Sequence, residues 1–163
     1  MASFSVRPAT RSDGAFLSDM VVEAANWRQG GARPKHAIIS SPEHNRYVGG
    51  WMRPSDAGFV AVDGNGAPIG AAWYRILPRS EPGFGYVATG VPELIIGVRP
   101  IWRAHGVGRA LLQRLTTLAR DAGHARISLS VERGNFAITL YRSEGFAITH
   151  PGIGRDTMTK RLR

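Results

Sequence analysis

A glycine-containing segment carries the strongest chemical signal in the chain: Arg103-Ala104-His105-Gly106-Val107-Gly108-Arg109. It follows the apolar run Glu93–Val98 and precedes a run with helical periodicity, so the predicted order is strand, loop, helix. Such a loop turns several backbone N–H groups toward one point, and the N-terminus of the following helix adds the positive end of its dipole. No Asp or Glu occurs from Leu94 through Arg120 to repel an anion. The segment therefore predicts a phosphate-binding loop.

Two other phosphate-binding motifs begin with similar glycines, and the sequence argues against both. Gly106 and Gly108 would open a dinucleotide-binding fingerprint, but Leu111 stands where the third glycine belongs. The acidic residue that such a fold places about 20 positions further on is also missing. A nucleoside-triphosphate loop would end in Gly-Lys followed by Ser or Thr, which this segment lacks.

The overall composition limits the class of protein. A length of 163 residues fits one domain, 1–163, and no apolar run approaches the roughly 18 residues of a membrane span. Without cysteine the chain has no disulfide and no thiolate metal site. The segment Met1–Pro8 lacks an apolar signal core, so a cytoplasmic location is expected.

The formal net charge of +9 comes mainly from arginines spread along the whole chain, with Lys35 and Lys160 as the lysines. A basic nucleic-acid-binding protein is one interpretation of this charge. We expect no nucleic acid as partner, because no block of five or six like charges and no aromatic-basic repeat occurs.

The elements that position the loop follow from periodicity and turn residues. Strands are predicted at 4–7, 59–62, 69–77, 93–98, 127–131, 146–148 and, paired at an edge, 157–162. Helices are predicted at about 12–26, near 43–51 and over 107–122, and a short one is predicted between Asn135 as its cap and Gly145 at its end. The order is mixed α/β (α+β), with a hairpin first and a βαβ unit later.

The stretch from Ile96 to Leu112 resembles the acetyl-CoA loop of the GCN5-related N-acetyltransferases (GNATs). The loop pattern of that family is Gln or Arg, two residues, Gly, one residue, then Gly or Ala; Arg103, Gly106 and Gly108 fill it.

Further along, Asn135, Leu140-Tyr141 and Gly145-Phe146 are similar to the next cofactor-contacting segment of the family. The resemblance covers about 58–149. It implies a central mixed, mostly antiparallel twisted sheet of six to seven strands, flanked by about four helices. It also implies transfer of an acetyl group from acetyl-CoA to a primary amine by direct attack in a ternary complex, without a metal.

The resemblance carries roles onto individual residues. Backbone groups of the central strand would bind the pantetheine arm, one amide there would polarise the thioester carbonyl, and the loop would bind the pyrophosphate. Asn135 either bonds the cofactor arm or only caps the short helix. The implied cofactor-binding residues are Ile96, Gly97, Val98, Arg103, Ala104, His105, Gly106, Val107, Gly108, Arg109 and Asn135.

Two further residues are candidates for proton transfer. Amine acylation needs a neutral amine, and Glu93, at the start of the central strand, is the candidate base; the alternative is a solvated strand-end carboxylate. Tyr141 matches the tyrosine that protonates the leaving thiolate in this family; the alternative is an aromatic on the inner face of a short helix.

The sequence indicates less about the acceptor substrate than about the cofactor. Trp27, Trp73 and Tyr86 are candidate walls of an acceptor cleft, although ordinary core and loop anchors are the competing interpretation. A small amine, an amino acid or a peptide amine all remain open. So does a non-catalytic acyl-CoA-binding module, and a homodimer is an arrangement common among similar proteins. The five histidines lack metal-ligand spacing, so no metal site is predicted.

Overall fold

The computed structural model describes residues 3–28 and 32–163. Its seven-stranded sheet has the order β1-β2-β3-β4-β5-β7-β6. The strands are β1 (Phe4–Pro8), β2 (Ala57–Asp63), β3 (Pro68–Arg75), β4 (Glu93–Val98), β5 (Arg126–Glu132), β6 (Ala147–Pro151) and β7 (Arg155–Arg161). The helices are α1 (Gly14–Ala25), α2 (Lys35–Ile39), α3 (Pro42–Asn45), α4 (Val107–Asp121) and α5 (Ala137–Ser143), with 3-10 turns η1 (Arg11–Asp13) and η2 (Pro100–Trp102).

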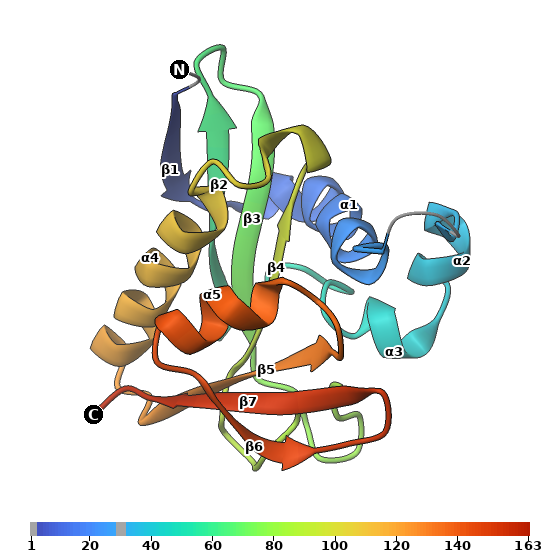
Figure 1. Cartoon of the computed structure of the whole chain (residues 1–163), viewed down its shortest axis with the longest axis vertical. Helices are drawn as coiled ribbons and strands as arrows, with labels where there is room; N and C mark the ends of the chain where they lie inside the picture. The colour runs from blue at the N-terminus through green and yellow to red at the C-terminus, as the bar shows by residue number, and fades with distance from the viewer. Residues whose placement is uncertain (1–2, 29–31) are drawn as a thin grey trace.

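The sheet is divided into two parts at β4 and β5. These strands pair in parallel and the other neighbours pair antiparallel. The parallel ladder joins Glu93 to Ser128, near the beginning of each strand, and from there the strands diverge (Figure 1). The mixed, mostly antiparallel sheet that the sequence predicts is confirmed. The divergence opens a wedge between β4 and β5.

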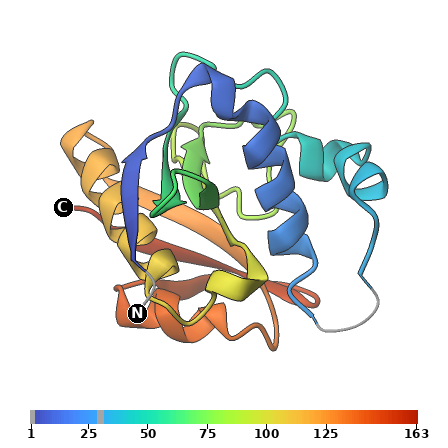
Figure 2. The same cartoon turned by 90° about the horizontal axis from the view of Figure 1, so that it is seen from above.

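Helices α1 and α4 cover opposite faces of the first part of the sheet (Figure 2). The predicted apolar face of α4 is confirmed at Val107, Leu111 and Leu115, which are buried against β2, β3 and β4. The buried stripe also includes Leu112 and Ala119, because a helix lying on a sheet needs an apolar face about 100° wide.

On the other face, α1 approaches β4 closely at Gly97. A Cβ atom added there would lie 2.6 Å from the backbone oxygen of Met20. The ladder with β3 runs through Gly97 without interruption, so the glycine permits close contact between elements and marks no bulge.

Three expectations about elements are corrected. The helix expected near 43–51 is replaced by two shorter ones, α2 and α3, although residues 29–31 of this irregular segment lie outside the described residues. The last strand, β7, is inserted between β5 and β6, so the sheet edge is β6, all of whose residues are exposed. Trp73, expected in the acceptor cleft, is fully buried beneath α1, where its indole N–H donates to the backbone oxygen of Tyr47 at 2.8 Å.

None of the described helices is both long enough and apolar enough to cross a membrane.

Candidate active site

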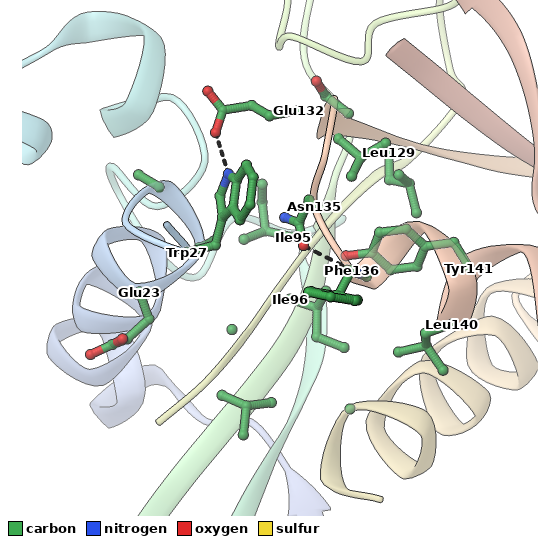
Figure 3. A pocket seen from close by; sticks show the side chains of 18 of the residues that line it. Glu23, Trp27, Ile95, Ile96, Leu129, Glu132, Asn135, Phe136, Leu140 and Tyr141 are labelled. Carbon is green, nitrogen blue, oxygen red and sulfur yellow. Dashed lines mark hydrogen bonds between the residues drawn. The ribbon is translucent and has the colours of Figure 1, made fainter. Parts of the chain in front are cut away.

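The wedge between β4 and β5 holds a cavity of about 1240 Å³. Its walls come from the end of α1, from β4, from the loop before α4, from β5 and from α5 (Figure 3). Pockets that bind drug-sized ligands have volumes of about 300–1,000 Å³. This cavity is larger, so it has room for a larger ligand.

The glycine loop forms one end of this cavity. Gly106, with φ of 83°, is the N-cap of α4, and Ala104 also has a positive φ, 61°. These left-handed residues reverse the chain, so the first N–H groups of α4, which have no partner within the helix, face the same space as the loop. Gly106, Val107 and Gly108 line the cavity, as the sequence analysis expects for a loop that binds an anion.

Two arginines of this loop are paired with carboxylates, which the acid-free run 94–120 does not indicate. Arg103 pairs with Glu23 of α1 at 3.4 Å, and Arg109 pairs with Glu144 and also bonds to Ser143. Both carboxylates come from outside the acid-free run 94–120, so local sequence could not reveal them.

The side chain of His105 is turned away from the cavity. Its Nδ1 lies 2.8 Å from the backbone oxygen of Arg103, and its ring packs against Trp102. His105, expected to bind the cofactor, is therefore not among the described residues that line the cavity, although Ala104 and Gly106 on either side of it are.

Strand β4 presents unpaired backbone to the cavity. The N–H of Arg99 donates to Ile69 on the β3 side, at 2.8 Å. Because the N–H groups of a strand alternate between its two sides, those of Ile96 and Val98 point away from β3, toward the wedge. Ile96, Gly97 and Val98 all line the cavity. This strand thus offers a row of donors and acceptors to an extended ligand.

Tyr141, on α5, lies across the wedge from β4 and lines the cavity (Figure 3). Burial raises the pKa of its phenol well above the usual value, so the hydroxyl keeps its proton and is a donor at neutral pH. Asn135 also lines the cavity, and its Oδ1 accepts the N–H of Ala137 at 2.9 Å. The N-cap of α5 is Phe136, so Asn135 stands one position before the cap and bonds to the first residue of the helix.

Glu93 is 3% exposed and is held behind the cavity wall. Its Oε2 accepts the hydroxyl of Tyr47 at 2.5 Å and the N–H of Gly85 at 2.9 Å. Its Oε1 is buried and has no hydrogen-bond partner among the described residues. Burial raises the pKa of Glu93 to about 7, against the smaller opposing effect of these donors. The interpretation as a solvated strand-end carboxylate is therefore wrong.

Tyr47 connects this carboxyl to the cavity. It lines the cavity, donates to Glu93 and accepts the N–H of Phe84 at 2.7 Å. Burial raises the pKa of Tyr47 well above its ordinary value. Sequence reasoning missed this residue, which lies in the irregular 28–54 segment without any motif.

The end of the cavity opposite the loop contains further polar groups that the sequence did not single out. Glu132 accepts the indole N–H of Trp27 at 2.5 Å and pairs with Arg155 at 3.5 Å (Figure 3). His44 packs against Phe84, and burial lowers the pKa of its imidazole, which is therefore neutral at pH 7.

Of the three residues expected to form the acceptor wall, the structure brings Trp27 to the cavity. Tyr86 is half-buried in the β3–β4 loop, where its hydroxyl lies 3.3 Å from Thr89 Oγ1, outside the set of described residues that line the cavity. Trp73 belongs to the core. Within residues 3–28 and 32–163, no group of three His, Asp or Glu residues could hold a metal ion.

Comparison with known proteins gives consistent matches. A family model described as "Acetyltransferase (GNAT) family" matches residues 24–146. Mycothiol acetyltransferase from Cellulomonas flavigena is 31% identical over 132 residues, which cover 76% of this chain and 37% of that protein. The enzyme of that name from Thermobifida fusca is 36% identical over 103 residues, covering 60% of this chain and 30% of that protein. The chain thus spans about a third of the length of these curated relatives.

Solved structures share the fold over nearly the whole chain. PaiA N-acetyltransferase from Thermoplasma acidophilum, in complex with coenzyme A, superposes with a TM-score of 0.71, 17% identity and coverage of 98% of this chain and 99% of that one. A GCN5-related N-acetyltransferase from Kribbella flavida gives a TM-score of 0.64 and 25% identity, covering 97% of each chain.

Proposed function

Because the chain belongs to the acetyltransferase (GNAT) family, we propose that it transfers an acetyl group from acetyl-CoA to a primary amine within a ternary complex. The observation that carries this proposal is the cavity itself. It gathers the glycine loop, the unpaired backbone of β4 and the protonated phenol of Tyr141 around one space.

In this proposal the cofactor lies along the wedge. Its pyrophosphate binds the N–H groups of residues 103–109 and of the first turn of α4. Its pantetheine arm follows β4, hydrogen-bonded to the backbone of Ile96 and Val98, with Asn135 facing the arm from the other wall. One N–H of β4, that of Val98, donates to the thioester carbonyl oxygen, where negative charge develops during attack.

The reaction requires two proton transfers. The neutral amine attacks the thioester carbon, the new C–N bond forms, and the C–S bond then breaks. The nitrogen loses a proton to a base, and the departing thiolate takes one from the hydroxyl of Tyr141, so the products are an amide and free CoA. Burial keeps this phenol protonated at neutral pH, and the same rise in pKa makes it a weaker acid, so its role as donor rests on its place in the cavity.

Glu93 is the proposed base, acting indirectly. With a pKa of about 7, it accepts a proton at neutral pH far better than an ordinary carboxylate. Glu93 lies behind the wall, so the proton must pass through an intermediate group. The hydroxyl of Tyr47, bonded to Oε2 at 2.5 Å, is in position to carry it.

The experiment that tests this function uses the full chain. Acetyl-CoA should raise the melting temperature, and incubation with a panel of amines should release free CoA thiol. The acceptor of the mycothiol acetyltransferases belongs in this panel. Stabilisation by acetyl-CoA without thiol release from any amine would instead favour a non-catalytic acyl-CoA-binding module. Absence of both, with salt-dependent retention on DNA, would favour the nucleic-acid interpretation.

A further inference from the structure

The cavity end opposite the glycine loop, which we call the acceptor end, is formed by Trp27, His44, Phe84, Glu132 and Arg155. The aromatic rings of Phe84 and Trp27 line it, and each ring has a guanidinium over one face. Its place in the cavity, beyond β4 and away from the loop, is where a second substrate would approach the thioester of the proposed reaction.

The carboxylate of Glu132 is already engaged by the protein. Its Oε2 accepts the N–H of Trp27 at 2.5 Å, and its Oε1 lies 3.5 Å from the guanidinium of Arg155. Both oxygens therefore have partners. A carboxylate oxygen can accept a further hydrogen bond, but the negative charge of Glu132 is already balanced by the nearby guanidinium of Arg155, which lowers its attraction for an ammonium group.

Positive charge predominates at this end. Arg28, Arg33 and Arg155 line the cavity together with two carboxylates, those of Glu23 and Glu132. Glu23 is paired with Arg103 of the glycine loop, so among the described lining residues Glu132 is the carboxylate left to balance these three arginines. Arg28 stacks over the ring of Trp27, with its Cζ 4.8 Å from the centroid. The balance of three guanidiniums and one carboxylate favours an anionic ligand.

Arg155 is the best placed of these cations. Its guanidinium lies over the ring of Phe84, with Cζ 3.8 Å from the centroid, and its side chain is 30% exposed. Its polar contacts are long: 3.3 Å to Ser130 Oγ and 3.5 Å to Glu132. The ring fixes the guanidinium, while these long contacts leave its donors incompletely used. A fixed, partly desolvated guanidinium is suited to bind a carboxylate through two parallel hydrogen bonds.

We propose that the acceptor is an amine that also carries a carboxylate, with free α-amino acids as the smallest members of the class. Arg155 binds the carboxylate, Phe84 and Trp27 pack against the apolar part, and the amine points toward β4 and Tyr141. This inference rests on the proposed acetyl transfer and names the substrate class for the same cavity.

The test compares matched acceptors: phenylalanine, its amide, and spermidine as a cationic amine, each with acetyl-CoA and detection of CoA thiol. The amine of the amide is less basic, so a larger fraction is neutral, and without carboxylate recognition the amide would react faster. We expect phenylalanine to have a kcat/KM about tenfold or more above that of the amide. We expect R155Q to raise the KM for phenylalanine about tenfold to a hundredfold.

Several controls make this result specific. R155Q should leave the KM values for the amide and for acetyl-CoA unchanged. R161Q changes an arginine at the exposed end of the same strand and should leave the KM values for phenylalanine, the amide and acetyl-CoA unchanged. R155K retains the charge but cannot form two parallel hydrogen bonds with a carboxylate, so its KM for phenylalanine should lie between those of wild type and R155Q. R155K also replaces R155Q in this test if R155Q does not fold.

The outcomes separate this inference from the proposed function. Preference for the amide or spermidine, or an equal loss for acid and amide in R155Q, would overturn the inference while acetyl transfer stands. If acetyl-CoA binds but no amine is acetylated, the proposed function is overturned, and the inference with it.

Discussion

Replacing Glu93 by glutamine should make the protein more stable at alkaline pH while removing activity. Burial raises the pKa of this carboxyl to about 7, from an ordinary value of 4.5. At about 1.4 kcal/mol for each pKa unit, ionising the buried group costs the folded state about 3 kcal/mol. Glutamine has nearly the same shape, keeps an acceptor for Tyr47 and Gly85, and is never charged.

The sign of the pH dependence follows from proton binding. Between about pH 4.5 and 7 the folded wild type holds a proton on Glu93 that the unfolded chain has lost. The stability of the wild type therefore falls as the pH rises through this window and levels off above it. E93Q lacks this contribution. We expect it to be more stable than wild type by about 3 kcal/mol at pH 8.5, and by about 1 kcal/mol or less at pH 5.

The assay is urea denaturation of both proteins at pH 5 and pH 8.5, with E81Q as control because Glu81 is an exposed carboxylate of the same β3–β4 loop. For a chain of this size, 3 kcal/mol corresponds to a melting temperature higher by about 6–12 °C. In parallel, the kcat of the wild type should rise as the pH passes about 7, and E93Q should lose that rise. If E93Q is less stable than wild type at pH 8.5, then burial does not destabilise the ionised carboxyl of Glu93, and the raised pKa is refuted.

Three further substitutions test other parts of the molecule. Gly108→Val places a branched side chain against Leu140 in the cavity, so the KM for acetyl-CoA should rise about tenfold or more; an unchanged KM contradicts the cofactor assignment. Tyr141→Phe should lower kcat by about tenfold or more with little change in that KM, whereas Tyr86→Phe, outside the cavity, should not; a loss of less than a few fold leaves Tyr141 without an acid role. Asp56→Asn breaks the ion pair that the buried guanidinium of Arg75 makes at 2.7 Å, so urea denaturation should show a loss of about 3–5 kcal/mol; a loss below 1 kcal/mol would mean that the guanidinium finds other partners.

The part of the site that binds the cofactor could be predicted because its determinants are local. The apolar run of β4, the glycines of the loop and the helical period of α4 follow one another within about thirty residues of sequence. Each pattern specifies its own element, and the short connections leave little freedom in how the elements meet. Gly97 belongs to this local information only in part, because a glycine within a strand indicates either a bulge or a close backbone approach, and its contact with α1 is known only from the structure.

The order of the last strands and the surroundings of Glu93 could not be predicted in the same way. Met158 is the one apolar residue within β7, so the strand has no hydrophobic alternation that would distinguish an edge strand from one inserted between β5 and β6. The hydroxyl that bonds Glu93 comes from Tyr47, 46 positions away, through a segment without periodicity. For Trp73, residue type indicates burial but not which side of the sheet buries it.

The two halves of the cavity consequently differ in how freely sequence change can alter them. The loop end is made by consecutive elements and by backbone groups, so most side-chain substitutions there leave its N–H donors in place. The acceptor end is made by side chains from distant segments: Trp27 and Glu132, which bond across the cavity, are 105 positions apart. A substitution in any one of these segments changes the charge or shape at this end without disturbing the donors of β4 and the loop. In the proposed reaction, this arrangement would let one cofactor site serve different acceptors, and the residues that select the acceptor would be Arg155, Glu132 and Trp27 rather than the glycine motif.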